Sequence, residues 1–183
     1  MKNNYLKGSI IAIILLLFLI SAVSVVSADD KDGADLTMLT LSKGGITIQY
    51  PSNWGSSQST SNYSVMAISK IDSIDSFGIG QVNIQVEKKG YEGDFYNFVN
   101  ESYDSMQKDP SFQLVSSGGV SIDGMDAVEY IYTSSQNGEE KEHKAVWFEK
   151  GGQAYVIMYS APIDQFEDNL NVFDYVLSGI QIT

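Results

Sequence analysis

The stretch "GMDAVEYIYTSSQNGEEKEHKAVWFEKGGQAYVIMYSAP", Gly124 to Pro162, decides the fold. It contains three extended, apolar-rich segments separated by Asn137-Gly138 and Gly151-Gly152, and another extended segment, 112–122, precedes it across Asp123-Gly124. Asp-Gly, Asn-Gly and Gly-Gly between extended segments are typical of tight hairpin turns. Strands joined by such turns pair antiparallel. The stretch therefore predicts a four-stranded antiparallel meander.

Two strands of this meander are apolar on both faces, namely residues 145–148 and 155–159. A strand that is apolar on both sides needs cover on both sides of its sheet. Two amphipathic helices flank the meander in the sequence, so we expect one helix on each face.

The first helix is predicted to begin at Phe95 after an Asp94 cap and to end at Asp109-Pro110. Its apolar residues recur at steps of three and four. The second runs from Phe166 towards Ile180 with the same periodicity. Asp164 and Glu167 are spaced as a capping box, and Gly179 is a stop signal.

Three further strands are predicted before the first helix. Ile46, Ile48 and Tyr50 alternate with polar residues, and Pro51 ends that strand. The other two strands are expected at residues 65–71 and 82–88, and residues 52–61 are expected to form a loop. The predicted order is three strands, a helix, four strands and a helix.

This order, and the residues that carry it, resemble the PsbP-like family over residues 44–183. The pieces that carry the resemblance are "GITIQYPSNW", "FYNFVNESYDSM", the meander quoted above and "FEDNLNVFDYVLSGIQI". The resemblance implies an α+β fold, a three-layer α/β/α sandwich around an antiparallel sheet of about seven strands. These pieces are packing patterns and not catalytic signatures, so the resemblance indicates the fold and leaves the role open.

The first 28 residues are typical of a signal peptide, because Lys2 and Lys7 precede a long apolar run and Val26-Ser27-Ala28 fits a cleavage site. The alternative is an uncleaved membrane anchor, since residues 9–28 are long enough to cross about 30 Å of hydrocarbon. Both interpretations place the domain outside the cytoplasm, at the cell surface or beyond it. Residues 29–43 are expected to be an acidic linker, and residues 44–183 to be one domain.

The charge argues against two classes of partner. The chain has 11 basic and 23 acidic residues, every basic residue is Lys, and two of them lie in the leader, so the mature charge is 9 minus 23, or -14. Nucleic-acid binding needs dense positive charge, and docking on anionic lipid needs a basic patch. We therefore expect neither, and membrane contact only through the N-terminal segment. The chain has no Cys, so disulfides and cysteine chemistry are excluded.

Few residues are candidates for chemistry. His143 is the one imidazole of the chain, and its neighbours Glu142 and Lys144 suggest a surface position. A two-histidine metal site is therefore excluded, and no metal, cofactor or catalytic residue is predicted. Glu129 is the carboxylate that we single out as a candidate for chemistry, although its alternating position in a strand suggests that it faces solvent.

Four residues are candidate contacts for a ligand or partner: Tyr50, Trp54, Glu129 and His143. For Trp54, packing against the end of the sheet is the favoured interpretation over stacking on a ligand. Asn62 and Asn100 each begin a glycosylation sequon, the first in an expected loop and the second on the first helix.

The leading hypothesis is a non-catalytic binding or assembly module at the cell surface that engages a protein or a small ligand. The alternative is a carboxylate-dependent hydrolase that acts on surface glycans through residues such as Glu129 or Glu142. A third interpretation is a structural envelope protein without a specific ligand.

Overall fold

The structure is a computed structural model that describes residues 37–57, 63–136 and 138–183. The leader, most of the expected linker and Asn62 lie outside these residues.

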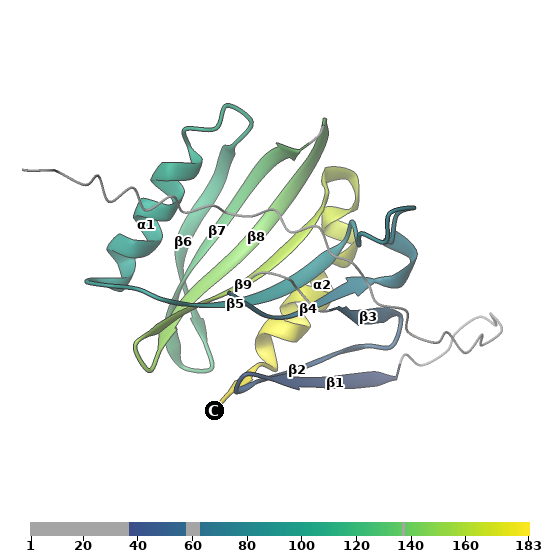
Figure 1. The fold of residues 1–183 in the computed structure, drawn as a ribbon, viewed down its shortest axis with the longest axis horizontal. Coiled ribbons are helices and arrows are strands. Elements are labelled where there is room, and N and C mark those ends of the chain that lie inside the picture. Colours follow the sequence, from purple (N-terminus) through teal and green to yellow (C-terminus); the bar gives the residue numbers. More distant parts are fainter. Residues whose placement is uncertain (1–36, 58–62, 137) are drawn as a thin grey trace, which may run out of the picture.

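Within the described residues, seven strands form one antiparallel sheet. The strands are β3 (Trp54–Ser57), β4 (Ser64–Lys70), β5 (Asn83–Gly90), β6 (Gln113–Ile122), β7 (Met125–Gln136), β8 (Glu139–Lys150) and β9 (Gln153–Pro162). Their order across the sheet is β3-β4-β5-β9-β8-β7-β6 (Figure 1). The meander is confirmed, because β6, β7, β8 and β9 pair with their neighbours in the chain.

Two helices cover the two faces of this sheet, α1 (Phe95–Met106) and α2 (Phe166–Ser178) (Figure 1). Val99 and Tyr103 of α1 pack in a cluster with Ala145 of β8. Phe173 of α2 packs on the opposite face, in a cluster with Val146. The alternation of apolar side chains along β8 therefore supplies both clusters, and the predicted α+β three-layer sandwich is confirmed.

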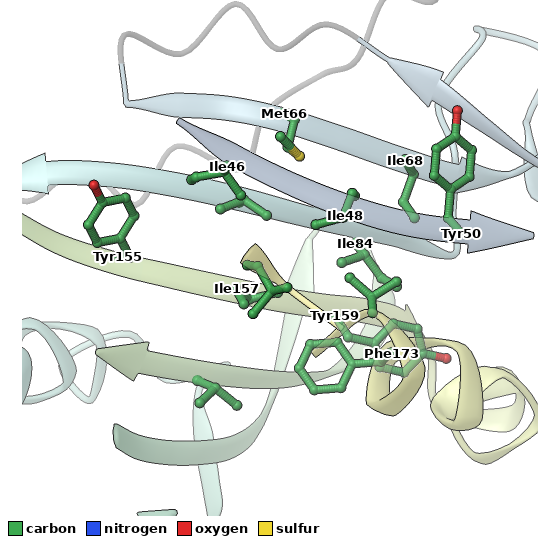
Figure 2. Packing of buried hydrophobic residues seen from close by; sticks show 14 of the residues in the cluster. Ile46, Ile48, Tyr50, Met66, Ile68, Ile84, Tyr155, Ile157, Tyr159 and Phe173 are labelled. Carbon is green, nitrogen blue, oxygen red and sulfur yellow. The ribbon is translucent and has the colours of Figure 1, made fainter. Parts of the chain in front are cut away.

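A second, three-stranded sheet lies on the α2 side of the molecule (Figure 1). It consists of β1 (Met38–Lys43), β2 (Ile46–Pro51) and β10 (Gln181–Ile182) in the order β1-β2-β10. The buried face of β2 joins the cluster that contains α2. Figure 2 shows Tyr50 beside Ile68 and Ile48 next to Ile84, in the cluster that also contains Ile157 and Tyr159 of β9.

Three local predictions were wrong. Five strands precede α1 in the described residues, instead of three. β1 lies in the segment expected to be linker, where its backbone pairs with β2 although its side chains stay largely exposed. β3 lies in the segment expected to be a loop, where it pairs with β4.

The helix starts were predicted with mixed success. The Asp94 side chain accepts a hydrogen bond from the Asn97 amide at 2.9 Å, so the expected cap of α1 is confirmed. Asp164 does not cap α2, because it lies in a short 3-10 turn, η2 (Ile163–Gln165), that leads into the helix. Gly179 follows the last residue of α2, as expected.

Candidate functional site

His143 lies in the interior, so the expectation of a surface histidine was wrong. Only 4% of it is exposed. Its Nδ1 is 2.7 Å from the hydroxyl oxygen of Ser160 on β9, and its Nε2 is 2.9 Å from that of Ser134 on β7. Its ring also stacks on Tyr132, with 4.7 Å between the centroids. The imidazole therefore links the side chains of three adjacent strands.

The surroundings of His143 keep it neutral. Burial, with a smaller contribution from the nearby Lys141 charge, lowers the pKa of the imidazole from 6.5 to about 3. A neutral imidazole donates one hydrogen bond and accepts another, which suits two hydroxyl partners. Ser160 is itself only 5% exposed. Both members of this Ser and His pair are therefore almost fully removed from solvent.

An acid lies on the same face of the sheet. Burial raises the pKa of Glu87 on β5, although the Lys89 charge opposes that rise. Burial, together with the Glu87 charge, raises the pKa of the Tyr132 hydroxyl. That hydroxyl donates a hydrogen bond to the sulfur of Met158 at 3.3 Å. The polar groups of this face thus extend from β5 to β7.

Glu129 is part of an ion-pair network and does not simply face solvent. Its carboxylate is 3.3 Å from Lys144 Nζ, which is also 3.3 Å from the Asp174 carboxylate of α2. The side chains of Lys144 and Glu129 are 15% and 24% exposed. The same ammonium lies 5.5 Å from the centroid of the Phe173 ring. Lys144 of β8 therefore links Glu129 of β7 to Asp174 of α2.

The two carboxylates of the hydrolase hypothesis are far apart along the sheet. Glu129 pairs with Val146, whereas Glu142 pairs with Thr133. Val146 and Glu142 are four residue steps apart along an extended strand, which is about 13 Å. Glycosidase carboxyl pairs are about 5 to 9.5 Å apart. This spacing disfavours Glu129 and Glu142 as a catalytic pair.

Trp54 and Tyr50 belong to the core. Trp54 is 2% exposed and Tyr50 is 6% exposed, and both lie in the cluster on the α2 side. This burial agrees with the packing interpretation of Trp54 and leaves little ring surface for a ligand.

The Asn100 sequon is engaged in the fold. Asn100 is exposed on α1, but its side-chain oxygen accepts a hydrogen bond from the Tyr130 hydroxyl at 2.8 Å. The hydroxyl of Ser102 is bonded to the Phe98 carbonyl oxygen, and Ser102 is 1% exposed. Glycosylation at Asn100 therefore stays an expectation that the folded helix disfavours.

One loop displays an aromatic ring to solvent. Phe77, in the segment between β4 and β5, is 80% exposed. The Asp75 carboxylate accepts hydrogen bonds from the amides of Phe77 and Ile79 and from the side chain of Gln81, at 2.8 to 2.9 Å. These bonds fix the loop around the exposed ring. Sequence reasoning missed this feature, although an Asp two residues before Phe77 is typical of an Asx turn.

The outer strand β6 is a second exposed feature that sequence reasoning missed. It pairs with β7 on one side and with no other described strand. Its residues from Gln113 to Gly119 are all exposed, including Leu114 at 43% and Val115 at 59%. None of its ten residues is charged. Such an edge offers unpaired backbone groups to another strand.

Among residues 37–57, 63–136 and 138–183, no group of three or more His, Cys, Asp or Glu side chains has a metal-binding arrangement. Over the same residues, no helix has the length and apolar character needed to cross a bilayer.

The sequence matches the family described as PsbP-like protein over residues 10–179. The chain belongs to the PsbP-like family. No curated protein matches this PsbP-like chain at a significant level.

Solved structures share the fold of this PsbP-like chain. It is 16% identical to cyanobacterial PsbP (CyanoP) from Synechocystis sp. PCC 6803, with a TM-score of 0.57 over 86% of this chain and 99% of that one. It is also 16% identical to LpqN of Mycobacterium tuberculosis, described as involved in cell envelope biogenesis, with a TM-score of 0.58 over 82% of this chain and 92% of that one. PA94 of Pseudomonas aeruginosa, described as a protein of unknown function and putative regulator, is 13% identical with a TM-score of 0.52, over 78% of this chain and 94% of that one.

Proposed function

We propose that this protein is a non-catalytic binding and assembly module that acts outside the cytoplasm and engages a protein partner. The observation that carries the proposal is the open, uncharged edge of the main sheet at β6. Sheet edges bind protein segments through their backbone groups. The exposed ring of Phe77, held on a loop fixed by hydrogen bonds, is a second surface suited to a protein contact.

Two further observations support this proposal. Two of the residues considered for chemistry are engaged within the fold, since the His143 ring lies between the hydroxyls of Ser134 and Ser160 and Glu129 is paired with Lys144. Membership of the PsbP-like family favours an accessory role.

The proposed location rests on the sequence and on one relative. Residues 1–28 are typical of an export signal or an anchor. LpqN, which shares the fold, is described as involved in cell envelope biogenesis. A protease added to intact cells should digest the protein if it is exposed outside. Its survival until the cells are opened would contradict an exposed location.

The partner is tested by mild cross-linking of intact cells, followed by purification of the protein through an affinity tag. We expect one defined polypeptide to be recovered with the tagged protein and not with a tagged, exported protein of unrelated fold. Failure to recover any specific polypeptide, at several cross-linker lengths, would contradict the proposal.

A further inference from the structure

The unpaired edge of β6 has a regular half and an interrupted half. A bulge lies between Leu114 and Ser116, where the register with β7 shifts. Bulges are one device that protects sheet edges from pairing. From Ser116 to Ile122 the strand follows β7 residue by residue. This second half is seven residues long and contains neither Lys nor Pro, the residues that usually protect an edge.

The middle of this regular half is open on both faces of the sheet. Gly118 and Gly119 are neighbours in the strand, so their missing side chains leave space on opposite faces. A Cβ atom at either position would have no described atom within 4 Å, apart from its own chain neighbours. Large aromatic residues pair well across from an edge glycine, because the ring covers the exposed backbone.

The far end of the regular half is acidic. Asp123 follows β6 directly in the turn, and Asp126 lies opposite Ser121 on β7. Both aspartates are exposed. An incoming strand would lie about 5 Å from β6 and about 10 Å from β7. A lysine or arginine on that strand would therefore lie within about one Debye length of both carboxylates.

A second copy of the chain fits this edge poorly. The formal net charge of the chain is -12, and a large net charge disfavours self-association. Pairing of two β6 strands around a twofold axis at Gly118 and Gly119 would bring no basic residue to either Asp123, because the strand has none. A basic segment of another protein would avoid the repulsion between two acidic chains and would bring positive charge to Asp123.

We propose that the edge of β6 from Ser116 to Ile122 binds an extended segment of a partner protein, antiparallel, as an eighth strand of the main sheet. The segment has an uncharged, β-branched or aromatic centre that pairs with Gly118 and Gly119. It has basic residues at the end that lies beside Asp123 and Asp126. This inference rests on the proposed function as a protein-binding module and names the surface and the chemistry of the partner.

The test uses the intact protein and two synthetic peptides. One has the sequence Lys-Lys-Thr-Val-Tyr-Val-Thr-Val, which in antiparallel alignment places its lysines beside Asp123 and its tyrosine across from Gly119. The matched peptide has Glu in place of both lysines. Hydrogen exchange, followed by mass spectrometry, should slow in residues 116–122 when the first peptide is added. We expect it to bind about tenfold more tightly than the matched peptide at low salt.

A double variant separates binding that depends on the two aspartates from non-specific peptide binding. D123N/D126N removes both carboxylates, and Asn tolerates the positive φ of 48° at position 123. In this variant the preference for the lysine peptide should fall below about threefold. The control variant D72N/D164N changes two exposed acids far from β6 and should keep the preference.

Three outcomes would overturn the inference. The first is that the lysine peptide does not slow hydrogen exchange in residues 116–122, and the second is that it slows exchange only elsewhere. The third is that exchange in residues 116–122 slows with rising protein concentration in the absence of peptide, which would indicate a second copy at the edge. If the peptide fails but cross-linking in cells still recovers a partner, the binding function stands and only the assignment to β6 is lost.

Discussion

The imidazole of His143 and the hydroxyl of Ser160 are 2.7 Å apart across the β8 and β9 pair, and both side chains are buried. In an accessible site, such a pair would suggest a nucleophile and its base. Here the pair is buried, and the imidazole stacks on Tyr132, a member of the cluster that contains α1. A residue pair of this kind is therefore no evidence of a catalytic site when both side chains are buried.

The burial of His143 predicts a specific sensitivity to acid. The pKa is about 3 in the folded protein and about 6.5 for an ordinary His, so between these values the unfolded chain takes up a proton that the folded chain does not. This group has no effect above about pH 6.5, and below it the free energy of unfolding falls by up to about 1.4 kcal/mol per pH unit until about pH 3. Urea unfolding at a series of pH values measures this slope.

The control for this slope is the variant H143Q, whose amide can still donate to one serine and accept from the other. It should be less stable near neutral pH, but its stability should fall less steeply with acid than that of the wild type. Glu87 and the other carboxylates titrate in both proteins, so the difference between the two slopes reports His143. Equal slopes would contradict the assignment.

Substitution by Ala is expected to affect stability differently at Gly80 and at Gly118. A Cβ at Gly80 would lie 2.4 Å from the Cβ and Oγ of Ser69, which is 1% exposed. Gly80→Ala should therefore destabilise the protein by about 1 to 3 kcal/mol. Gly118→Ala meets no described atom within 4 Å and should be neutral or slightly stabilising. Chemical denaturation of both variants measures their free energies of unfolding. An equal loss of stability in both would contradict the expected clash between the new Cβ at position 80 and Ser69.

The packing of Trp54 predicts a large loss of stability on truncation. Trp54→Ala removes a fully buried ring and should destabilise the protein by about 3 to 5 kcal/mol. Tyr96 is 47% exposed, so Tyr96→Ala should change stability by only about 0.5 kcal/mol. Thermal unfolding of the two variants makes the comparison. A mild effect of Trp54→Ala would instead favour the interpretation in which its ring serves a ligand.

The ion pair between Glu129 and Lys144 leads us to expect that Glu129→Gln lowers the stability of the protein slightly and affects no glycan hydrolysis. Glu129→Gln leaves Lys144 paired with Asp174 and should destabilise the protein by about 1 kcal/mol or less. Asp174→Asn is the matched change on the other side of Lys144. A panel of glycans incubated with the wild type should show no turnover. Turnover that Glu129→Gln abolishes would restore the hydrolase hypothesis.

The fold could be predicted largely because its signals are local. The turns at Asp123-Gly124, Asn137-Gly138 and Gly151-Gly152 defined the meander, and the Asp94 cap marked the start of α1. The short strands β1 and β3 could not be found this way. β1 stays largely exposed and is defined by backbone pairing with β2, which side-chain alternation does not report.

The surroundings of the candidate residues depend on contacts between strands. Neighbours in the sequence therefore gave a wrong prediction of whether His143 is buried. Glu142 and Lys144 made His143 look exposed, although the hairpin turns pair it directly with Tyr132 and Ser160. Projecting the register from Asn137-Gly138 and Gly151-Gly152 would have predicted this environment. The exposed edge of β6 depends on which strand is last in the sheet, and that order is a property of the whole fold.

The most direct test of the binding role is photo-cross-linking in intact cells from single positions on the protein. A photoreactive residue is placed at Val115 on β6, at Phe77 on the fixed loop, and at the buried Phe173 as the control. We predict a discrete cross-linked product with another polypeptide from at least one exposed position and none from the control. If no exposed position gives a product with any other protein, the account of this PsbP-like protein as a binding module is contradicted.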